Sequence, residues 1–144
     1  MTEIKNKKVY FNYYIEEEYE SGIVLSGTEI KSIRKGSIDI KDSYIRIKNN
    51  EAYVINMYIA KYEVGEFYNH DEYRERKLLL HKKEIKKLKD RISIEGYTLI
   101  PLKVYLKKGY AKLLIGVCKG KKIYDKRKAI KEKDLKRLDR QNGF

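Results

Sequence analysis

The fold is decided by the stretch from Tyr97 to Val117, which reads YTLIPLKVYLKKGYAKLLIGV. Apolar and polar residues alternate along both halves, which is the period of a β-strand with one apolar face. We expect the core-facing positions to be Thr98, Ile100, Leu102, Val104 and Leu106, then Ala111, Leu113, Ile115 and Val117. A turn at Lys108-Gly109 joins the halves into a long antiparallel hairpin, because glycine gives the turn its backbone freedom. Proline cannot donate to a strand ladder, so Pro101 predicts an edge or a bulge.

A second hairpin is predicted around Asn49-Asn50, since asparagine tolerates the positive φ of a tight turn. Ile45 and Ile47 precede the turn, and apolar residues follow it at period two: Tyr53, Ile55, Met57 and Ile59. A further pair of short strands is expected at 13–15 and 22–25, separated by the acidic run from Glu16 to Glu20.

Helical segments are predicted at three places in the chain. Thr28 is a candidate N-cap for a short helix on which Ile30 and Ile33 share a face. From Lys82 to Arg91 the spacing of Ile85, Leu88 and Ile92 indicates an amphipathic helix. Its opposite face carries five lysines: Lys82, Lys83, Lys86, Lys87 and Lys89. A helical turn is expected over 71–76, before three leucines at 78–80.

The predicted elements define the fold class. With 144 residues, the chain has the length of one domain. Several short antiparallel strands with about three small helices favour a mainly β protein. We expect a partly closed, OB-like antiparallel β-barrel, because closure removes exposed sheet edges.

The composition changes near Lys119. From there to Arg140 the chain has 11 Lys and Arg against 4 Asp and Glu, with few aliphatic residues. Such a segment cannot bury enough apolar surface to offset its ordering entropy, although its residues are good helix formers. We therefore expect a folded domain over 1–122 and a basic tail over 123–144 that is disordered alone and becomes ordered on a polyanionic surface.

The charge points to polyanionic partners. The formal net charge is +13 and the pI about 9.6, and cationic proteins gain affinity for nucleic acid by releasing its counterions. Cys118 is the single cysteine, so an intrachain disulfide is impossible. There is no secretory segment and no long apolar run, so we expect a cytoplasmic protein without a membrane span.

No pattern indicates catalysis. Two histidines, His70 and His81, lack a nucleophile signature nearby, and we interpret them as surface residues rather than as acid–base catalysts of RNA processing. The carboxylates of 16–20 alternate between two strand faces, which disfavours a metal site. The sequence predicts a binding protein without metal or cofactor, and an RNA-processing enzyme remains the least favoured alternative.

The best binding signal lies on the long hairpin. Its face opposite the core interleaves basic and aromatic side chains: Tyr97, Lys103, Tyr105, Lys107, Tyr110 and Lys112. Lysines reach phosphates, and tyrosine rings stack on exposed bases or pack on riboses. With 14 tyrosines in the chain, any single ring can instead fill a cross-strand pair, but the interleaved face as a whole favours RNA.

Two motifs link the chain to a known family. Residues 27–32 read GTEIKS, and residues 120–127 read GKKIYDKR. In this order they resemble the signatures of the SsrA-binding protein family, also called small protein B, and the resemblance extends from Asn6 to about Lys133. It implies a protein of bacterial ribosome rescue by trans-translation, which binds the tRNA-like part of transfer-messenger RNA and stands in for its missing anticodon arm.

The resemblance also implies site residues. Glu29 of the first motif, Leu79 in Arg76-Lys77-Leu78-Leu79-Leu80, and Lys112 match RNA-contacting positions of the family. From sequence alone, Glu29 can equally be a helix N-terminal charge and Leu79 a core residue. The candidate RNA-binding residues are Glu29, Lys31, Arg34, Arg76, Lys77, Leu79, Lys103, Tyr105, Tyr110, Lys112, Lys119, Lys121 and Lys122. Candidate contacts to the ribosomal decoding centre are Tyr124, Asp125, Lys126 and Arg127.

The partners follow from the same resemblance: transfer-messenger RNA, the 30S subunit and the 70S ribosome, with alanyl-tRNA synthetase and elongation factor Tu acting on the complex. We expect a monomer. The alternative is a nonspecific single-strand RNA-binding barrel or RNA chaperone with a basic arm, which would show no preference for transfer-messenger RNA over random RNA.

Overall fold

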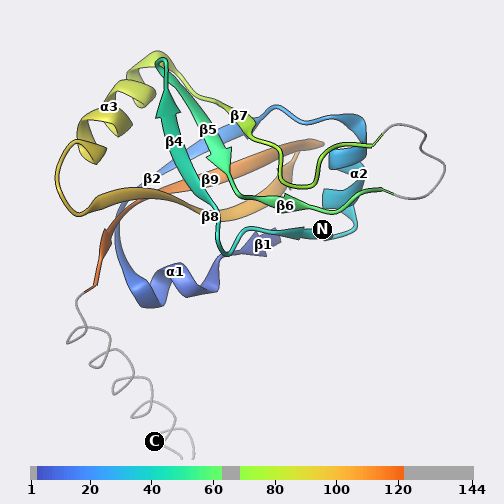
Figure 1. The fold of residues 1–144 in the computed structure, drawn as a ribbon, viewed down its shortest axis with the longest axis horizontal. Coiled ribbons are helices and arrows are strands. Elements are labelled where there is room, and N and C mark those ends of the chain that lie inside the picture. The colour runs from blue at the N-terminus through green and yellow to red at the C-terminus, as the bar shows by residue number, and fades with distance from the viewer. Residues whose placement is uncertain (1–2, 63–68, 122–144) are drawn as a thin grey trace, which may run out of the picture.

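The computed structural model describes residues 3–62 and 69–121, drawn in colour in Figure 1. The elements follow in the order β1 (Glu3–Lys5), α1 (Lys7–Asn12), β2 (Tyr13–Ile23), α2 (Gly27–Arg34), β3 (Ile38–Asp39), β4 (Tyr44–Lys48), β5 (Glu51–Ile55), β6 (Tyr58–Ile59), β7 (Arg76–Leu79), α3 (Lys82–Ile92), β8 (Tyr97–Lys107) and β9 (Tyr110–Gly120). The predicted tail over 123–144 lies outside the described residues, and so do its candidate residues Tyr124, Asp125, Lys126 and Arg127. The candidate Lys122, just before the tail, lies outside them as well.

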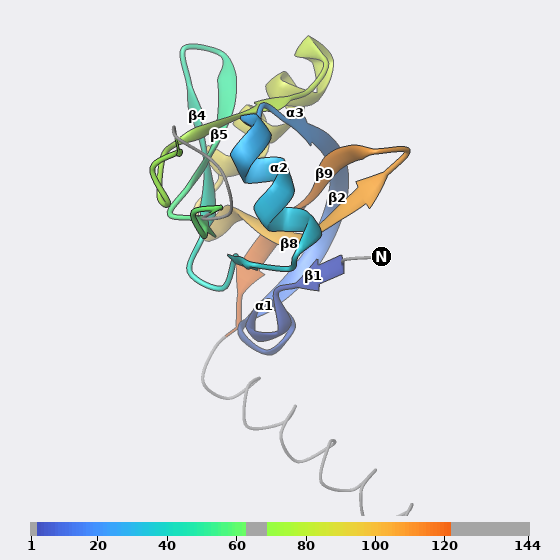
Figure 2. The ribbon, with the colours of Figure 1, turned by 90° about the vertical axis from the view of Figure 1, so that its right-hand side faces the viewer.

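Seven strands form one antiparallel sheet in the order β1-β8-β9-β2-β7-β5-β4, and β3 pairs with β6. The mainly β class with small helices is therefore confirmed. The sheet curves so that β4 lies against β8. Over residues 3–62 and 69–121 it does not close, since its edge strands β1 and β4 are not paired with each other. Figures 1 and 2 show α2 at one end of the sheet, with α1 and α3 toward the opposite end.

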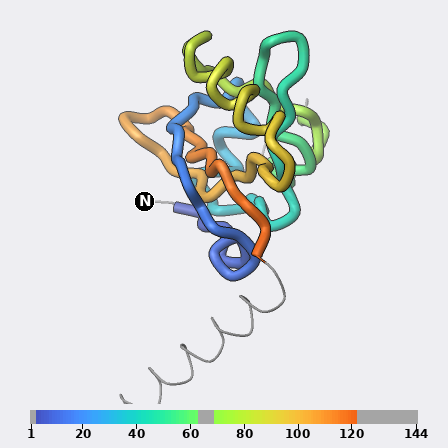
Figure 3. The backbone as a smooth tube through the Cα atoms, turned by 90° about the vertical axis from the view of Figure 1, so that its left-hand side faces the viewer, coloured from blue at the N-terminus to red at the C-terminus, as the bar shows by residue number. Residues whose placement is uncertain are grey.

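The β8–β9 hairpin is confirmed, and its tip projects from the body in Figures 2 and 3. Its register runs from Tyr97 opposite Lys119 to Lys107 opposite Tyr110. The turn uses positive φ at both central residues, 51° at Lys108 and 81° at Gly109. These are the angles that a tight hairpin turn requires.

The bulge predicted at Pro101 is also confirmed, and it corrects the predicted core face. The register shifts between Pro101 and Lys103, and the extra residue reverses which side the following side chains face. Before the bulge, Leu99 faces the main core; after it, Val104 does. Ile100 and Leu102 instead pack with Cys118 and Val9 in a second, smaller cluster under α1. The prediction that all five alternating residues of β8 share one core face was therefore wrong.

Gly116 is what allows the second cluster to pack against β9. A Cβ at this position would lie 2.7 Å from Cδ2 of Leu102, which is closer than real side chains approach. Glycine therefore lets Leu102 lie directly on the backbone of the neighbouring strand. In this way α1 covers one part of the outer side of the sheet and leaves the hairpin tip uncovered.

The predicted pair of short strands at 13–15 and 22–25 was wrong, because β2 is one continuous strand through the acidic run. Carboxylates do not interrupt a strand when they alternate with packed residues. Here Tyr19 packs on the core and Ser21 is buried, while Glu18 and Glu20 point to solvent. Arg91 of α3 lies 2.8 Å from a carboxylate oxygen of Glu16 and neutralises part of this charge.

The β4–β5 hairpin is confirmed at its turn, where φ is 52° at Asn49 and 61° at Asn50. The apolar residues after the turn do not form the single alternation from Tyr53 to Ile59 that the sequence predicted. Asn56 adopts a positive φ of 59° and ends β5. Ala52 and Val54 are buried before Asn56, and Met57 and Ile59 are buried after it, so the alternation shifts by one residue at Asn56. Tyr53 and Ile55 are only half-buried.

The helix α3 is confirmed, with Ile85 and Leu88 buried and the five lysines exposed. The N-cap of α2 is Ser26, not Thr28. The backbone N–H of Ser26 donates to Oε1 of Glu29 at 2.9 Å, which completes a capping box. The predicted helical turn over 71–76 is reduced to a short turn at Glu72 and Tyr73, before β7 begins.

Candidate nucleic-acid interface

Four adjacent strands place predicted site residues in one row on the solvent side of the sheet. Across the row, Tyr105 of β8 is opposite Lys112 of β9, Lys112 is opposite Gly22 of β2, and Gly22 is opposite Leu79 of β7. Leu79 is 54% exposed although it is a large aliphatic residue. We call Lys103, Tyr105, Lys112, Gly22 and Leu79 the outer face. It brings Leu79 and Lys112, 33 residues apart in the chain, within two strand spacings.

Gly22 is the member of the outer face that sequence reasoning missed. A Cβ here would lie 3.2 Å from Cβ of Leu79, so a larger residue would press on the neighbouring strand. Glycine leaves bare backbone between the ammonium of Lys112 and the apolar surface of Leu79. A glycine inside a strand pattern is a known signal for such close approach, and this signal was present in the sequence.

An acidic side chain, Glu20, lies beside the outer face. The hydroxyl of Tyr105 donates a hydrogen bond to Oε2 of Glu20, and Nζ of Lys107 lies 3.5 Å from its Oε1. Partial burial and the bond to Glu20 raise the pKa of Tyr105 to about 12. The bond from Tyr105 and the charge of Lys107 lower the pKa of Glu20. Near neutral pH this site therefore presents a fixed carboxylate among lysines, which can accept hydrogen bonds from donors on a ligand.

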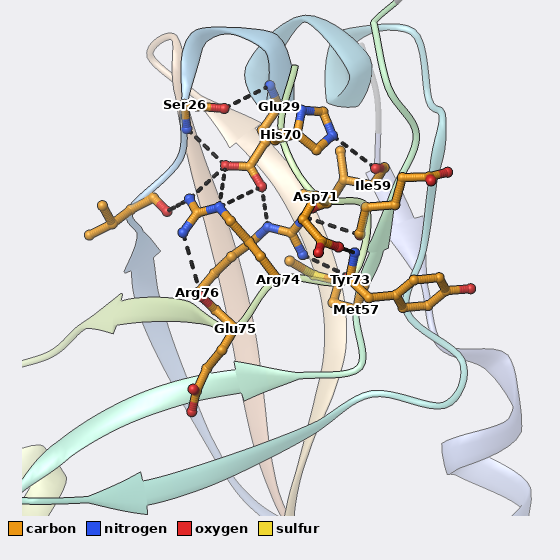
Figure 4. A network of polar contacts seen from close by, with 12 residues as sticks. Ser26, Glu29, Met57, Ile59, His70, Asp71, Tyr73, Arg74, Glu75 and Arg76 are labelled. Carbon is orange, nitrogen blue, oxygen red and sulfur yellow. Dashed lines mark hydrogen bonds and ion pairs between the residues drawn. The ribbon is translucent and has the colours of Figure 1, made fainter. Parts of the chain in front are cut away.

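Glu29 is the centre of a buried polar network, shown in Figure 4. Both Glu29 and Arg76 have 0% exposure. Arg76 donates through Nε to Oε2 of Glu29 and through Nη1 to the carbonyl oxygen of Met57, the latter at 2.7 Å. Arg74 donates from Nη2 to Oε1 of Glu29 at 2.6 Å. Burial alone would raise the pKa of Glu29, but hydrogen bonds from Arg74, the Ser26 backbone and Arg76 outweigh it and hold that pKa below its usual range.

This network gives two of the candidate residues a structural role. Glu29 and Arg76 are fully buried, and both oxygens of Glu29 accept hydrogen bonds. They connect α2 to the start of β7, and their contact with RNA stays a prediction. Arg74, which closes the network from the solvent side, was missed. Its partner lies 45 residues away, so no local pattern could have shown it.

His70 joins the same region and was wrongly interpreted as a surface residue. It is buried, with Nδ1 lying 2.8 Å from Oγ1 of Thr28 and Nε2 lying 2.9 Å from the carbonyl oxygen of Ile59. The ring therefore ties α2 to β6. His81, by contrast, is exposed at the start of α3.

The remaining predicted residues fall into separate groups. Tyr110 is 72% exposed at the hairpin tip, close to the outer face. Lys31 and Arg34 are exposed on α2, with Nζ of Lys31 5.3 Å from the ring centre of Tyr62. Lys77 lies on β7, where its Nζ is 3.6 Å from a carboxylate oxygen of Glu51.

Lys119 and Lys121 are not part of the outer face. Lys121 lies past the far end of β9, roughly 30 Å from Lys112 at the rise of a β-strand. Its Nζ is 3.3 Å from the carbonyl oxygen of Tyr10 in α1 and 5.0 Å from the ring centre of Tyr14. The structure therefore divides the predicted basic residues between two ends of the same hairpin.

Other kinds of site have less support. Within residues 3–62 and 69–121, no three His, Cys, Asp or Glu side chains are grouped closely enough to hold a metal ion. In the same part of the chain no helix is long and apolar enough to cross a membrane. Cys118 is buried, and burial raises the pKa of its thiol to about 11.

A curved antiparallel sheet with a net positive charge and an uncovered lysine–tyrosine face defines a small β protein suited to polyanions. Comparison with known proteins gives the family. A family model described as SmpB protein matches residues 3–142, and this chain belongs to that family.

Individual relatives agree with this assignment. An SsrA-binding protein of Bacillus velezensis is 56% identical over 146 residues, covering 97% of this chain and 94% of that protein. An SsrA-binding protein of Staphylococcus aureus is 58% identical over 133 residues, covering 92% of this chain and 86% of that protein. A solved chain from work described as "tmRNA-SmpB: a journey to the center of the bacterial ribosome" matches with a TM-score of 0.72 and 45% identity, covering 85% of this chain and 87% of that one.

Proposed function

We propose that this protein binds SsrA RNA, which is transfer-messenger RNA, and acts with it on the bacterial ribosome in trans-translation. Its SsrA-binding relatives match nearly the whole chain, and the similar solved chain belongs to a tmRNA–SmpB study of the ribosome. The observation that carries the proposal is the row in which Gly22 joins Lys112 to the exposed Leu79. This row is a surface suited to RNA in a chain whose relatives are SsrA-binding proteins.

The outer face supplies the two kinds of contact that RNA needs. Lys103 and Lys112 attract phosphates, and this part of the affinity is sequence-independent and sensitive to salt. Leu79, which is exposed beside the bare backbone of Gly22, offers an apolar platform for an unstacked base. The rings of Tyr105 and Tyr110 add further stacking surface.

Glu20 is a candidate for contacts that distinguish one base from another. A carboxylate distinguishes bases by accepting hydrogen bonds from their amino groups. Glu20 is exposed and held in place by Tyr105, whereas Glu29 is buried. We therefore assign base contacts to Glu20 and a positioning role to Glu29.

The finer features belong to the same proposal. The curved sheet forms a partly closed, OB-like barrel over 1–122 that takes the place of the missing anticodon arm. The segment 123–144 contacts the decoding centre through Tyr124, Asp125, Lys126 and Arg127. Alanyl-tRNA synthetase and elongation factor Tu act on the complex, while the protein itself is a noncatalytic, cytoplasmic monomer.

A binding competition tests the proposal. Labelled transfer-messenger RNA is bound to the protein and competed with unlabelled transfer-messenger RNA, elongator tRNA or random RNA of equal length. We expect transfer-messenger RNA to compete best. Equal competition by random RNA would instead favour the alternative, a nonspecific RNA-binding barrel or chaperone.

The variant Lys112→Glu tests the outer face in the same assay. We expect it to lower the affinity for transfer-messenger RNA severalfold, because it replaces a phosphate contact by repulsion. Lys41→Glu is the control, since Lys41 is an exposed lysine between β3 and β4 that belongs neither to the outer face nor to the candidate RNA-binding residues. If both variants lost the same affinity, net charge and not the outer face would account for binding.

A further inference from the structure

A groove of about 810 Å³ lies between β7 and α3, next to the outer face. Its floor is apolar and includes Leu79, Leu80 and Ile85. Leu79 also belongs to the outer face, so the two surfaces are continuous through one side chain. No local pattern indicates this groove, because its two sides come from a strand and a helix whose patterns are independent of each other.

One wall of the groove is a row of lysines on α3. Lys82, Lys86 and Lys89 lie on the helix side that faces the groove, as residues spaced by three or four positions do. Nζ of Lys89 already contacts Oδ1 of Asn50 at 3.3 Å. Lys82 and Lys86 are exposed, and neither side chain has a hydrogen-bond or ion-pair partner within residues 3–62 and 69–121.

The balance of charge in the groove is positive. Against the lysines stand Glu51, which is 3.6 Å from Nζ of Lys77, and Asp90 on α3. Lys77 is paired with Glu51, and Asp90 offsets one further charge, so four lysines against two carboxylates leave the groove with a net charge of +2. Lys89 remains charged although it contacts the neutral amide of Asn50. The side chains of Lys82 and Lys86 are exposed and line the groove, so an anion in the groove is within their reach.

We infer that this groove binds the sugar–phosphate backbone of the RNA that occupies the outer face, with Lys82 and Lys86 as the phosphate contacts. The inference rests on the proposed function and extends it by a second contact region. A lysine ammonium is a mobile point charge suited to phosphate oxygens rather than to base edges. The RNA would pass from Lys112 across Leu79 and continue along α3.

The helix itself provides a matched control. Lys83 and Lys87 lie on the same helix, have the same charge and are equally exposed, but do not line the groove. The double variants Lys82→Gln/Lys86→Gln and Lys83→Gln/Lys87→Gln therefore change net charge by the same amount. Glutamine is a good helix former, so α3 is preserved in both.

The experiment measures the affinity of the full chain for transfer-messenger RNA over a series of KCl concentrations. Each lost phosphate contact reduces the slope of log affinity against log salt by roughly 0.7 to 0.9. We expect Lys82→Gln/Lys86→Gln to lower affinity and to make the slope shallower by about 1.4 to 1.8. Lys83→Gln/Lys87→Gln should leave the slope unchanged.

Equal effects of the two double variants, or no effect of either, would overturn the inference. Neither result would touch the proposed function, which is tested separately by whether the unmodified protein prefers transfer-messenger RNA to random RNA. If that preference were absent while the groove variant still changed the slope, the groove would bind RNA backbone and the proposed function would be wrong.

Discussion

At the scale of single residues, Glu29 is the unexpected one, because its carboxylate is buried and paired with arginines. Glu29 sits in the first motif of the chain, where a negative charge at a helix N-terminus is favourable in itself. The structure adds two arginines, of which Arg76 is fully buried. A buried guanidinium requires a counter-charge, so the carboxylate and the arginine are mutually dependent.

We therefore predict that Glu29→Gln destabilises the protein by about 3–5 kcal/mol, because it leaves Arg76 as an uncompensated buried charge. The free energy of unfolding from urea titrations measures the effect. Glu75→Gln is the control, since Glu75 directly precedes β7, the strand that begins with Arg76, but is exposed. A loss below about 1 kcal/mol, the usual range of a surface ion pair, would contradict the prediction.

The same pair predicts a pH dependence. Hydrogen bonds hold the pKa of Glu29 below its usual range in the folded protein. The stabilisation is therefore fully present above the pKa of a glutamate in the unfolded chain, about 4.3. It is lost as the pH falls through the lower, folded value. The difference in unfolding free energy between the unmodified protein and Glu29→Gln should therefore shrink below about pH 4. A difference that stayed constant would show that Glu29 is not the titrating group.

At the scale of elements, the critical junction is between β2 and β7. It joins β1-β8-β9-β2 to β7-β5-β4 through two register pairs, Gly22 with Leu79 and Ile23 with Leu78. A backbone hydrogen bond of 2.9 Å from Val24 to Lys77 extends it. Because this contact is short, the packing of one glycine against one leucine bears on the whole sheet.

Gly22→Val should destabilise the protein by about 1–3 kcal/mol, because its branched side chain meets Leu79 and forces the strands apart. Combining it with Leu79→Ala should recover part of the loss, since alanine removes the Cγ and Cδ1 atoms that the added side chain meets but keeps the Cβ. The double-mutant cycle should give a coupling of at least about 0.5 kcal/mol. Strictly additive effects in urea unfolding would show that the contact between the two residues is not the cause.

Elements are also where prediction from sequence succeeded and failed for clear reasons. Both hairpin turns, the helix α3 and the bulge at Pro101 follow from local patterns, and all were predicted. The pattern did not show that the bulge turns Ile100 and Leu102 toward α1, because alternation alone does not say which element covers a strand. The Ser26 cap was missed because Thr28, two residues later, is also a residue type that caps helices, although serine is the better one.

The candidate site was predictable in part for the same reason. The exposed hairpin face follows from strand alternation, and Leu79 came from resemblance to the family. The row that joins them through Gly22 depends on pairing between distant strands. The burial of Glu29 depends on arginines 45 and 47 residues away. Neither long-range relation leaves a local pattern.

At the scale of the whole molecule, the hairpin separates two basic regions. The outer face lies near the tip, while Lys121, the last described residue, lies at the other end beside α1. Both apolar clusters are built from residues between Ile4 and Cys118. Among the described residues, the chain therefore leaves both clusters before Lys121, at the end of β9 away from the outer face.

This arrangement predicts that binding of transfer-messenger RNA can be separated from the function of the segment 123–144 on the ribosome. Truncation after Lys121 should change the free energy of unfolding by less than about 0.5 kcal/mol, as expected for changes outside a core.

The full-length variant Asp125→Ala/Lys126→Ala/Arg127→Ala should keep its affinity for transfer-messenger RNA, because Lys112 and Leu79 are unchanged. The same variant should abolish trans-translation in a reconstituted translation assay. Lys112→Glu is the reciprocal control: its trans-translation should recover at high protein concentration, since the substitution weakens only RNA binding. If the triple variant lost as much RNA affinity as Lys112→Glu, the two ends of β9 would form one RNA-binding surface, and the separation inferred from the fold would be wrong.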